Sequence, residues 1–419
     1  MPAPHPLTQT PSQAHRDGAG RSAPRIAGVD AARGLALIGM FSVHVYGAFA
    51  ADGSPTPAWM FAGGRSAATF ALMAGVGLAF TTGGRRPAVG RGAYVAVATR
   101  ALLIGLAGLL LGYASRAADL DVDVILTFYA LLFLCALPLL RLHPRTLIGL
   151  SLTLAVVGPV VLHLVRGALP EPAFDGDPTL TDVVTDPLGL LCDLLVHGNY
   201  PVLAWTAYLC AGLAVGRLDL TSKRVATRLL TGGLALAAGA WLAATVLLQW
   251  FGGLWHLWRA EFSDTPWREA RSEVLWDTSD GSTWWSLISR APHSTSPFDM
   301  LQTLGSAAAL LGAALLLTRL PLARKALAPL SAAGSMPLTL YCAHVLFLAT
   351  GALSDAPDLL YALQVAGALL FAVVWRRAVG RGPLETVVAA GARHARRAAE
   401  CHEPVTARPP TEPVDTKNP

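Results

Sequence analysis

The stretch Arg25–Tyr46 reads R-I-A-G-V-D-A-A-R-G-L-A-L-I-G-M-F-S-V-H-V-Y. Its apolar and small residues predict a membrane-spanning helix, yet it carries Asp30, Arg33 and His44. Arg33 and His44 are eleven positions apart, about three turns plus 20°, so both side chains face the same way, roughly 16 Å apart along the axis. Asp30 lies on that face and can pair with Arg33. Ionisable groups inside a spanning helix are costly, so this face predicts a functional site.

We expect Arg33 and His44 to look into one shared, water-containing cavity that is open to both sides of the membrane. That cavity would place an ion pair near one membrane surface and an imidazole well inside.

The composition predicts a polytopic membrane protein of the all-α class. The chain has 419 residues, of which 53% are hydrophobic and 14% charged, and its mean hydropathy is +0.48. A soluble protein carries about a quarter charged residues. Apolar runs near the roughly 20 residues needed to cross a bilayer predict a bundle of about ten transmembrane helices. The predicted spans are 27–49, 60–81, 93–114, 123–142, 145–166, 200–217, 226–250, 299–319, 328–351 and 357–377.

The charges between these spans predict the topology. Arginine and lysine collect in alternate connections, for example Arg85, Arg86 and Arg91, whereas the intervening connections are acidic or mixed. Basic connections lie on the cytoplasmic side, so both termini are predicted to be cytoplasmic in a multi-pass protein of the cell membrane. The net charge of +5 follows from this distribution, and we expect no nucleic-acid partner.

Four regions are predicted along the chain. Residues 1–24 are polar and lack the apolar core of a signal peptide, which predicts a disordered cytoplasmic tail. Residues 25–383 form the transmembrane domain. Residues 384–400 resemble a basic amphipathic helix lying on anionic lipid. Residues 401–419 are Pro-rich and are expected to be disordered.

Two extracytoplasmic connections are long, and both leave alternatives open. The first, 167–200, contains the apolar stretch Pro187–Val196, which is too short to span and either lies at the interface or re-enters. The second, 251–298, holds six tryptophans that act either as interfacial anchors or as a platform on which sugars stack. In the second span, small residues recur every fourth position and predict close packing against another helix: Ala67, Ala71, Gly75 and Ala79.

Several chemistries find no support in the sequence. The five cysteines show no CxxC spacing and resemble small core residues. Histidines and carboxylates lack metal-ligand spacing, so we predict no metal. No glycine-rich loop matches a nucleotide-phosphate motif, which disfavours ATP-driven transport.

The segment V-D-A-A-R-G-L-A-L-I-G-M-F (Val29–Phe41) resembles the opening signature of the YeiB-like membrane proteins. These are related to the catalytic domain of heparan-alpha-glucosaminide N-acetyltransferase. Four later blocks match the YeiB-like pattern in the same order: 198–217, P-H-S-T-S-P-F-D (292–299), G-S-M-P-L-T-L-Y (334–341) and G-P-L-E (382–385). The Arg33-to-His44 spacing is also similar to the first-helix motif of membrane O-acyltransferases that modify bacterial surface sugars.

The resemblance implies a ten-helix fold that takes an acyl group, here an acetyl group, from cytoplasmic acyl-CoA. It delivers that group to a sugar or another hydroxyl or amine acceptor on the opposite side. The heparan enzyme has asparagine at the position of His44, and its catalytic histidine lies in the loop after the first helix, where Ala50–Met60 has none. His44 is therefore expected to be the base or the acyl carrier. Arg33, paired to Asp30, would receive the CoA phosphates, and His344 matches a C-terminal histidine of the O-acyltransferases.

Further residues are candidates for holding the acceptor. Tyr341 lies one turn before His344 on the same helix face. The remaining candidates carry groups that can bond hydroxyls or anions near the extracytoplasmic ends of spans. They are Arg65, Ser66, His197, Asn199, Tyr200 and His293.

Two other functions stay open at this point. A transporter or exporter of a small molecule would use the same polar core, because intramembrane Asp, Arg and His also mark transport pathways. A non-catalytic subunit is the third reading. We expect membrane lipid and a small-molecule or glycan acceptor as partners and allow for a homodimer.

Overall fold

A computed structural model describes residues 26–401 except 88, 262 and 278–282, and omits the side chains of 268 and 269. The predicted tail 1–24 thus lies outside the described residues, as does the predicted tail 401–419 except for Cys401, which is the last residue of the last helix. The secondary-structure elements of the described residues are all helices. The described residues also form one isolated β-bridge, between Phe49 and Pro55. The predicted all-α class is confirmed.

Each predicted apolar run contains one helix or two consecutive ones. Six described helices are long and apolar enough to cross a membrane, whereas the total of ten spans and their sidedness stay predictions. The helices in these runs are α1 (Ala27–Tyr46), α3 (Arg65–Thr81), α4 (Arg91–Ala117), α5 (Leu126–Ala136) with η1 (Leu137–Arg141), α6 (Pro144–Val165), α9 (Val202–Gly216), α10 (Lys223–Trp250), α13 (Pro297–Leu317), α15 (Ala328–Ala333) with α16 (Pro337–Leu348), and α17 (Pro357–Ala378).

Two runs are broken where the sequence places helix-interrupting residues. The run 60–81 starts within α2 (Pro57–Ala62) and breaks at Gly63 and Gly64, and Gly64 has a φ of +65° that favours glycine. The run 328–351 breaks before Pro337, which lacks the N–H needed to continue the preceding helix. Both breaks change the direction of the chain beside α1.

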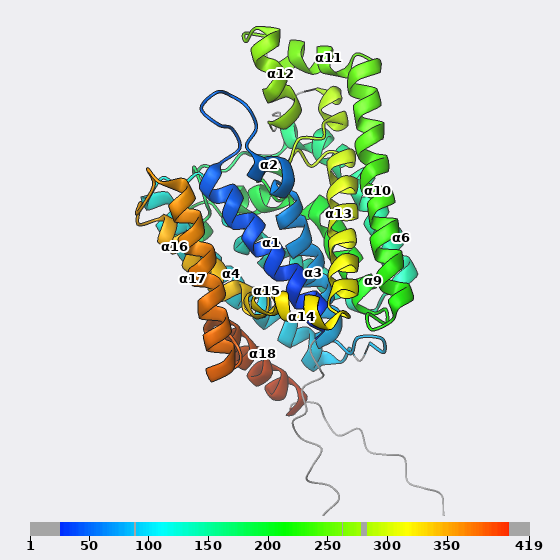
Figure 1. Cartoon of the computed structure of the whole chain (residues 1–419), viewed down its shortest axis with the longest axis vertical. Helices are drawn as coiled ribbons and strands as arrows, with labels where there is room; N and C mark the ends of the chain where they lie inside the picture. The colour runs from blue at the N-terminus through cyan, green and yellow to red at the C-terminus, as the bar shows by residue number, and fades with distance from the viewer. Residues whose placement is uncertain (1–25, 88, 262, 278–282, 402–419) are drawn as a thin grey trace, which may run out of the picture.

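The two ends of the helix bundle are distinguished by the short helices that lie there. We call the end at which α1 begins the lower end and the opposite one the upper end, as in Figure 1. The short helix α14 (Pro321–Ala326) and the last helix, α18 (Pro383–Cys401), lie at the lower end. The helix α1 therefore begins at the same end of the bundle as the one where α18 lies, and the assignment of this end to the cytoplasm stays a prediction.

Small residues bring the central helices into close contact, as the second span's sequence predicts. A Cβ atom on Gly75 of α3 would overlap the backbone of α9, and one on Gly212 of α9 would overlap the backbone of α3. Likewise a Cβ on Gly34 of α1 would overlap α15, and one on Gly334 would overlap α1. These contacts hold α3 against α9 and α1 against α15.

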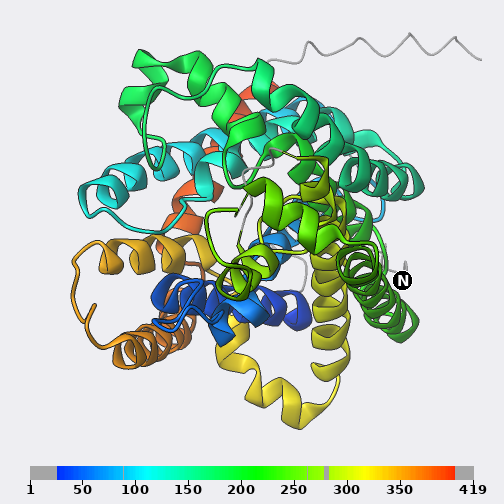
Figure 2. The ribbon, with the colours of Figure 1, turned by 90° about the horizontal axis from the view of Figure 1, so that it is seen from above.

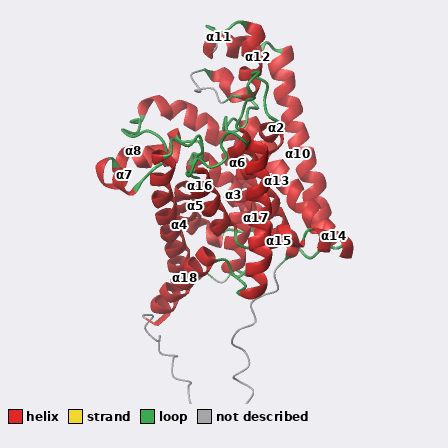
Figure 3. Ribbon diagram, turned by 60° about the vertical axis from the view of Figure 1, so that its left-hand side comes forward, coloured by secondary structure: helices red, strands yellow, loops and turns green. Residues whose placement is uncertain are grey.

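The first long connection folds into short helices at the upper end (Figure 3). They are α7 (Leu180–Thr185), α8 (Pro187–Cys192) and the π-helix η3 (Asp193–His197). The aspartate Asp182 caps the start of α7 and accepts from Arg116 of α4 at 2.7 Å. This pair ties the connection to the bundle.

The tryptophan-rich connection folds into a helical cap, which we define as α11 (Gly253–Glu261), α12 (Trp267–Trp276) and η4 (Trp284–Ile288). Seen from above, the cap lies over the middle of the bundle (Figure 2). Trp258, Trp267 and Trp285 pack around its own small core, so these three tryptophans build the cap itself. The side chain of Trp59 in α2 donates to the Trp276 carbonyl at 2.8 Å and fastens the cap to the bundle.

The last helix, α18, packs against α4 at the lower end (Figure 3). Its buried residues are Val388 and Ala392, and Gly391 lies beside Leu103 of α4. Part of the apolar face that the sequence assigns to lipid therefore contacts protein. Contact of the remaining face with anionic lipid stays a prediction.

Candidate functional site

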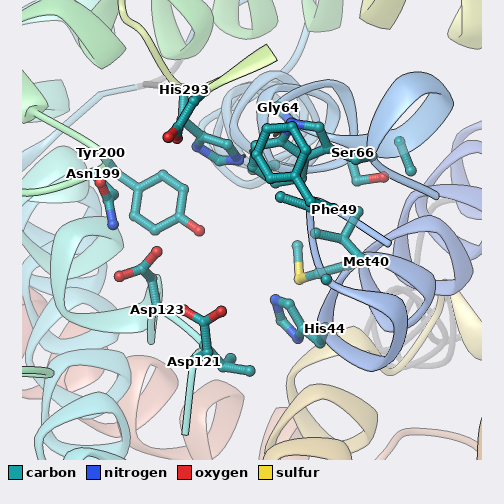
Figure 4. Close-up of a pocket in the computed structure, with 18 residues that line it drawn as sticks. Met40, His44, Phe49, Gly64, Ser66, Asp121, Asp123, Asn199, Tyr200 and His293 are labelled. Atoms are coloured by element: carbon teal, nitrogen blue, oxygen red, sulfur yellow. Dashed lines mark hydrogen bonds between the residues drawn. The ribbon is translucent and has the colours of Figure 1, made fainter. Parts of the chain in front are cut away.

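An upper cavity of about 320 Å³ collects five of the predicted site residues. They come from four separate parts of the chain and point toward a common space (Figure 4). These residues are His44, Ser66, Asn199, Tyr200 and His293. We call this space the upper cavity.

At the floor of the upper cavity, His44 belongs to a hydrogen-bonded chain of three side chains. Its Nδ1 atom lies 3.0 Å from Nε2 of His344 in α16. The Nδ1 atom of His344 lies 2.5 Å from Oε1 of Gln364 in α17. The ring of Phe41 stacks on His344 with 3.9 Å between centroids. The two predicted histidines are therefore brought together, and the Nε2 atom of His44 has no hydrogen-bond partner in the described part of the chain.

His293 forms the upper wall of the cavity. Its Nε2 atom accepts the backbone N–H of Gly64 at 3.2 Å, and its ring stacks on Trp59 with 5.7 Å between centroids. Burial lowers the pKa of His293 to about 4. The ring is therefore neutral at physiological pH with its acceptor nitrogen already occupied, which suits it to shape the wall and not to take a proton.

Two aspartates that the sequence analysis did not single out line the upper cavity, Asp121 and Asp123. The Asp123 side chain accepts a hydrogen bond from the Asn199 side chain. The Tyr341 hydroxyl donates to the backbone carbonyl of Asp123 at 3.2 Å. The Tyr200 hydroxyl points toward the same space (Figure 4). The wall thus offers oxygens that accept hydrogen bonds from hydroxyl or amine groups.

A second space, the lower cavity of about 250 Å³, holds Arg33. Arg33 pairs with Asp30 at 3.6 Å, as the spacing predicts, and donates to the Met73 carbonyl at 2.9 Å. Arg100 and Tyr341 also line this cavity. It adjoins a mouth of about 420 Å³ at the lower end, and the two share Arg100, Ser335 and Glu385. The mouth adds three arginines from the C-terminal part of the chain: Arg381, Arg393 and Arg396.

The expectation of one shared cavity for Arg33 and His44 is wrong. Arg33 lines the lower cavity and His44 the upper one, and Met40 lines both. Met40 lies on the same helix face between them, two turns after Arg33 and one turn before His44. Its long side chain is almost fully buried, at 6% exposure, and separates the two spaces.

Three predicted acceptor-binding residues, Arg65, His197 and Tyr341, do not line the upper cavity, and Tyr341 lines the lower one instead. Arg65 donates to the Met60 carbonyl at 3.0 Å and lines a different groove between α1, α2 and α13. His197 lies at the end of η3, where Arg166 and Glu171 are its charged neighbours. The geometry therefore does not support an acceptor-binding role for Arg65 or His197.

Some site residues escaped the sequence analysis although a signal existed. Arg100 lies within the predicted span 93–114, and Gln364 is a single amide within the apolar span 357–377. A polar group inside a span is a functional-site hypothesis by default. Among the described residues, no group of three or more His, Cys, Asp or Glu side chains is arranged to hold a metal ion.

Comparison with known proteins gives one match. The model of a family described as heparan-alpha-glucosaminide N-acetyltransferase, catalytic, matches residues 25–252, more than half of the 419-residue chain. The matched region includes Arg33, His44 and Asp123, whereas His344 and Gln364 lie beyond it. No curated protein and no solved structure matches the chain.

Proposed function

Because the chain belongs to the family of the heparan-alpha-glucosaminide N-acetyltransferase catalytic domain, we propose that it is a transmembrane acetyltransferase. It moves an acetyl group from cytoplasmic acetyl-CoA to a hydroxyl or amine acceptor, such as a sugar, on the extracytoplasmic side of the cell membrane. The lower end of the bundle is then cytoplasmic.

The position of Met40 between the two cavities carries this proposal. A transferase that works across a membrane needs each polar substrate to approach from its own side, while only the acyl group passes between them. The lower cavity ends at Met40 beside Tyr341, and the imidazole of His44 lies directly above. Only a short thioester end has to reach past one flexible side chain.

The arginines of the lower cavity and its mouth suit the phosphate groups of CoA. Guanidinium groups bind phosphate oxygens through paired, charge-assisted hydrogen bonds. Arg393 and Arg396 of α18 line the mouth together with Arg100 of α4 and Arg381. The nucleotide end of CoA binds in this mouth, and its pantetheine arm extends through the lower cavity toward Met40.

The upper cavity suits a polar acceptor. Carboxylate and hydroxyl oxygens at Asp121, Asp123 and Tyr200 accept hydrogen bonds, and Asn199 can both donate and accept them. The His44 ring lies at the floor, where the acceptor meets the acyl group. The Asp123 side chain, which accepts a hydrogen bond from Asn199, favours acceptor molecules that donate hydrogen bonds, such as sugars and amines.

The transfer step uses His44 as the general base. Its Nε2 atom takes the proton from the acceptor O–H or N–H as the acceptor atom attacks the thioester carbonyl carbon. The tetrahedral intermediate collapses, the carbon–sulfur bond breaks, and the CoA thiolate receives the proton from the His44 imidazolium. His344 shares the positive charge of that imidazolium through the 3.0 Å contact.

The test uses purified protein in liposomes with radiolabelled acetyl-CoA as donor and glucosamine as a probe acceptor. We expect labelled N-acetylglucosamine from the wild type and none above background from His44→Ala. Leu370→Ala, which changes a side chain with 67% exposure on the outside of α17, serves as the matched control. Equal product from wild type and His44→Ala would contradict the proposal.

The two separated cavities also fit a transporter, which remains the second candidate. A transporter binds its substrate alternately from two sides around a fixed site. Uptake of unmodified labelled glucosamine into the liposomes, without any acetylated product, would favour that function.

A further inference from the structure

Gln364 is an amide on the face of α17 that packs against the bundle. The residues around it on this face are apolar, among them Tyr361, Val365 and Ala368. The Oε1 atom of Gln364 lies 2.5 Å from Nδ1 of His344. A buried polar side chain is costly unless it is hydrogen-bonded, and this contact satisfies the amide oxygen, whereas the amide nitrogen has no partner among the described residues.

The surroundings of this contact are apolar. A groove of about 400 Å³ between α16 and α17 reaches His344 and Gln364 and is otherwise lined mainly by hydrocarbon side chains. Phe41 covers the other face of the His344 ring. In such a setting water does not compete, and a hydrogen bond is stronger than it is at a wet surface.

The geometry determines which ring nitrogens carry hydrogen. A carboxamide oxygen can only accept, so Nδ1 of His344 must donate to Gln364. A neutral imidazole carries one N–H, so Nε2 of His344 is then an acceptor. It accepts the N–H at Nδ1 of His44, 3.0 Å away. The Nε2 atom of His44 is left with a free lone pair at the upper cavity.

We propose that Gln364 is a positioning residue that sets the tautomers of both histidines, so that His44 presents an unprotonated Nε2 to the acceptor. This inference rests on the proposed function for its catalytic consequence, whereas the tautomers themselves exist without substrate. The reverse arrangement has a different chemistry. If the Gln364 amide nitrogen faced His344, both rings would carry hydrogen at Nε2, and His44 could donate but not accept.

Gln364→Leu and Gln364→Glu separate these arrangements. Leucine has a similar size but no acceptor, so the histidines lose the group that selects their tautomer. Glutamate keeps an acceptor oxygen at the same place and removes the amide N–H groups. Leu363→Ala, at a neighbouring position with 51% exposure that lines the same groove, is the matched control.

The first measurement is nitrogen-15 NMR of histidine-labelled protein in liposomes without substrate, with signals assigned by comparison with His44→Ala and His344→Ala. We expect both rings of the wild type and of Gln364→Glu to carry hydrogen at Nδ1. In Gln364→Leu a substantial signal from hydrogen at Nε2 should appear. Hydrogen at Nε2 of His344 in the wild type, or unchanged tautomers in Gln364→Leu, would overturn the proposal.

The second measurement is acetyl transfer to glucosamine across pH. For Gln364→Leu we expect kcat to fall by about 10²-fold, the lower range for loss of a general base, with the KM for acetyl-CoA unchanged. Gln364→Glu should keep kcat within about tenfold and move the acidic limb of its pH profile to higher pH, because a carboxylate stabilises the imidazolium. Equal kcat in Gln364→Leu and wild type would refute the catalytic consequence.

The two measurements separate failure of this inference from failure of the proposed function. If the wild type transfers no acetyl group but the tautomers change in Gln364→Leu, the acetyltransferase proposal fails and the positioning role of Gln364 holds. If the wild type is active and the tautomers do not respond, the inference about Gln364 fails alone. A folded state of each variant is checked by size-exclusion chromatography.

Discussion

The Nδ1 atom of His44 lies 3.0 Å from the Nε2 atom of His344, and 300 positions of sequence separate the two residues. His44 lines the upper cavity, whereas His344 lies behind His44 and is only 3% exposed. The contact joins α1, inside the region matched by the family model, to α16, outside that region. The two residues should therefore act as one unit.

The histidine pair predicts non-additive losses of activity. His44→Ala removes the base, and we expect acetyl transfer to fall by about 10³-fold or more. His344→Ala leaves the base in place but unoriented and should cost about 10- to 100-fold. Since His344 acts only through His44, the double variant should be no slower than His44→Ala. Steady-state rates of the four proteins check this, and fully additive losses would show two independent roles.

The mouth of the lower cavity predicts how the donor is bound. Arg393→Gln and Arg396→Gln remove guanidinium groups that line this mouth. We expect each change to raise the KM for acetyl-CoA by about tenfold, an order typical of one charge-assisted hydrogen bond, and to leave kcat nearly unchanged. The measurement is initial rate against donor concentration.

Acetyl-dephospho-CoA, which lacks the 3′-phosphate, identifies the phosphate concerned. If an arginine binds the 3′-phosphate, its replacement should not raise the KM for this analogue any further. Arg397→Gln is the matched control, because Arg397 is on the same helix but does not line the mouth. An equal rise of KM in all three variants would point to a general charge effect on the surface.

His293 predicts an acid-sensitive upper cavity. Its folded-state pKa of about 4 lies below the usual value of 6.5, so the unfolded chain takes up the proton first. The free energy of unfolding therefore falls as pH decreases from 6.5 to 4, by about 3 kcal/mol at 1.36 kcal/mol per pK unit. His293→Gln keeps an acceptor for the Gly64 N–H and removes this dependence.

The check is the midpoint of thermal unfolding in detergent at pH 7 and pH 4.5. The drop in midpoint between the two should be smaller in His293→Gln than in the wild type. Every other titratable group is present in both proteins, so the difference between their drops isolates His293. Equal drops would contradict the assignment.

Much of the fold follows from local sequence properties. Apolar runs near the membrane thickness predict the helices of the bundle, and their ends agree with the structure within a few residues at α1, α6 and α17. The spacing of Asp30 and Arg33 predicts their ion pair. Such features depend on neighbours along one helix, and sequence periodicity reports these directly.

The features that the sequence did not predict depend on contacts between helices that are distant along the chain. Periodicity places Arg33 and His44 on one face of α1 but cannot show that Met40, on the same face, separates two cavities. Gln364 becomes informative only when α17 is placed beside α16. Three tryptophans of the cap pack against residues such as Leu257 and Val274 of the same cap. These partners carry no distinctive sequence signal, so the sequence alone could not show this packing.

Met40 predicts how the acyl group is selected. Because its side chain lines both cavities, Met40→Ala should join them and make room for longer acyl groups. We expect the rate with butyryl-CoA relative to acetyl-CoA to rise by about tenfold, since a methylene in an apolar pocket changes discrimination by at least that order. Hydrolysis of acetyl-CoA without an acceptor should also increase, because water from the upper cavity then reaches the thioester.

Two further variants test whether the increases in butyryl transfer and hydrolysis are caused by joining the two cavities. Met40→Leu nearly conserves side-chain volume and should keep the wild-type preference. Met73→Ala enlarges the lower cavity, which Met73 lines without contacting the upper one. If Met73→Ala increased butyryl transfer and hydrolysis as much as Met40→Ala does, the gain would come from space in the lower cavity alone. Since Met40 is the only described residue that lines both spaces, we expect acceptor-independent hydrolysis to rise in Met40→Ala and to stay at the wild-type level in Met73→Ala.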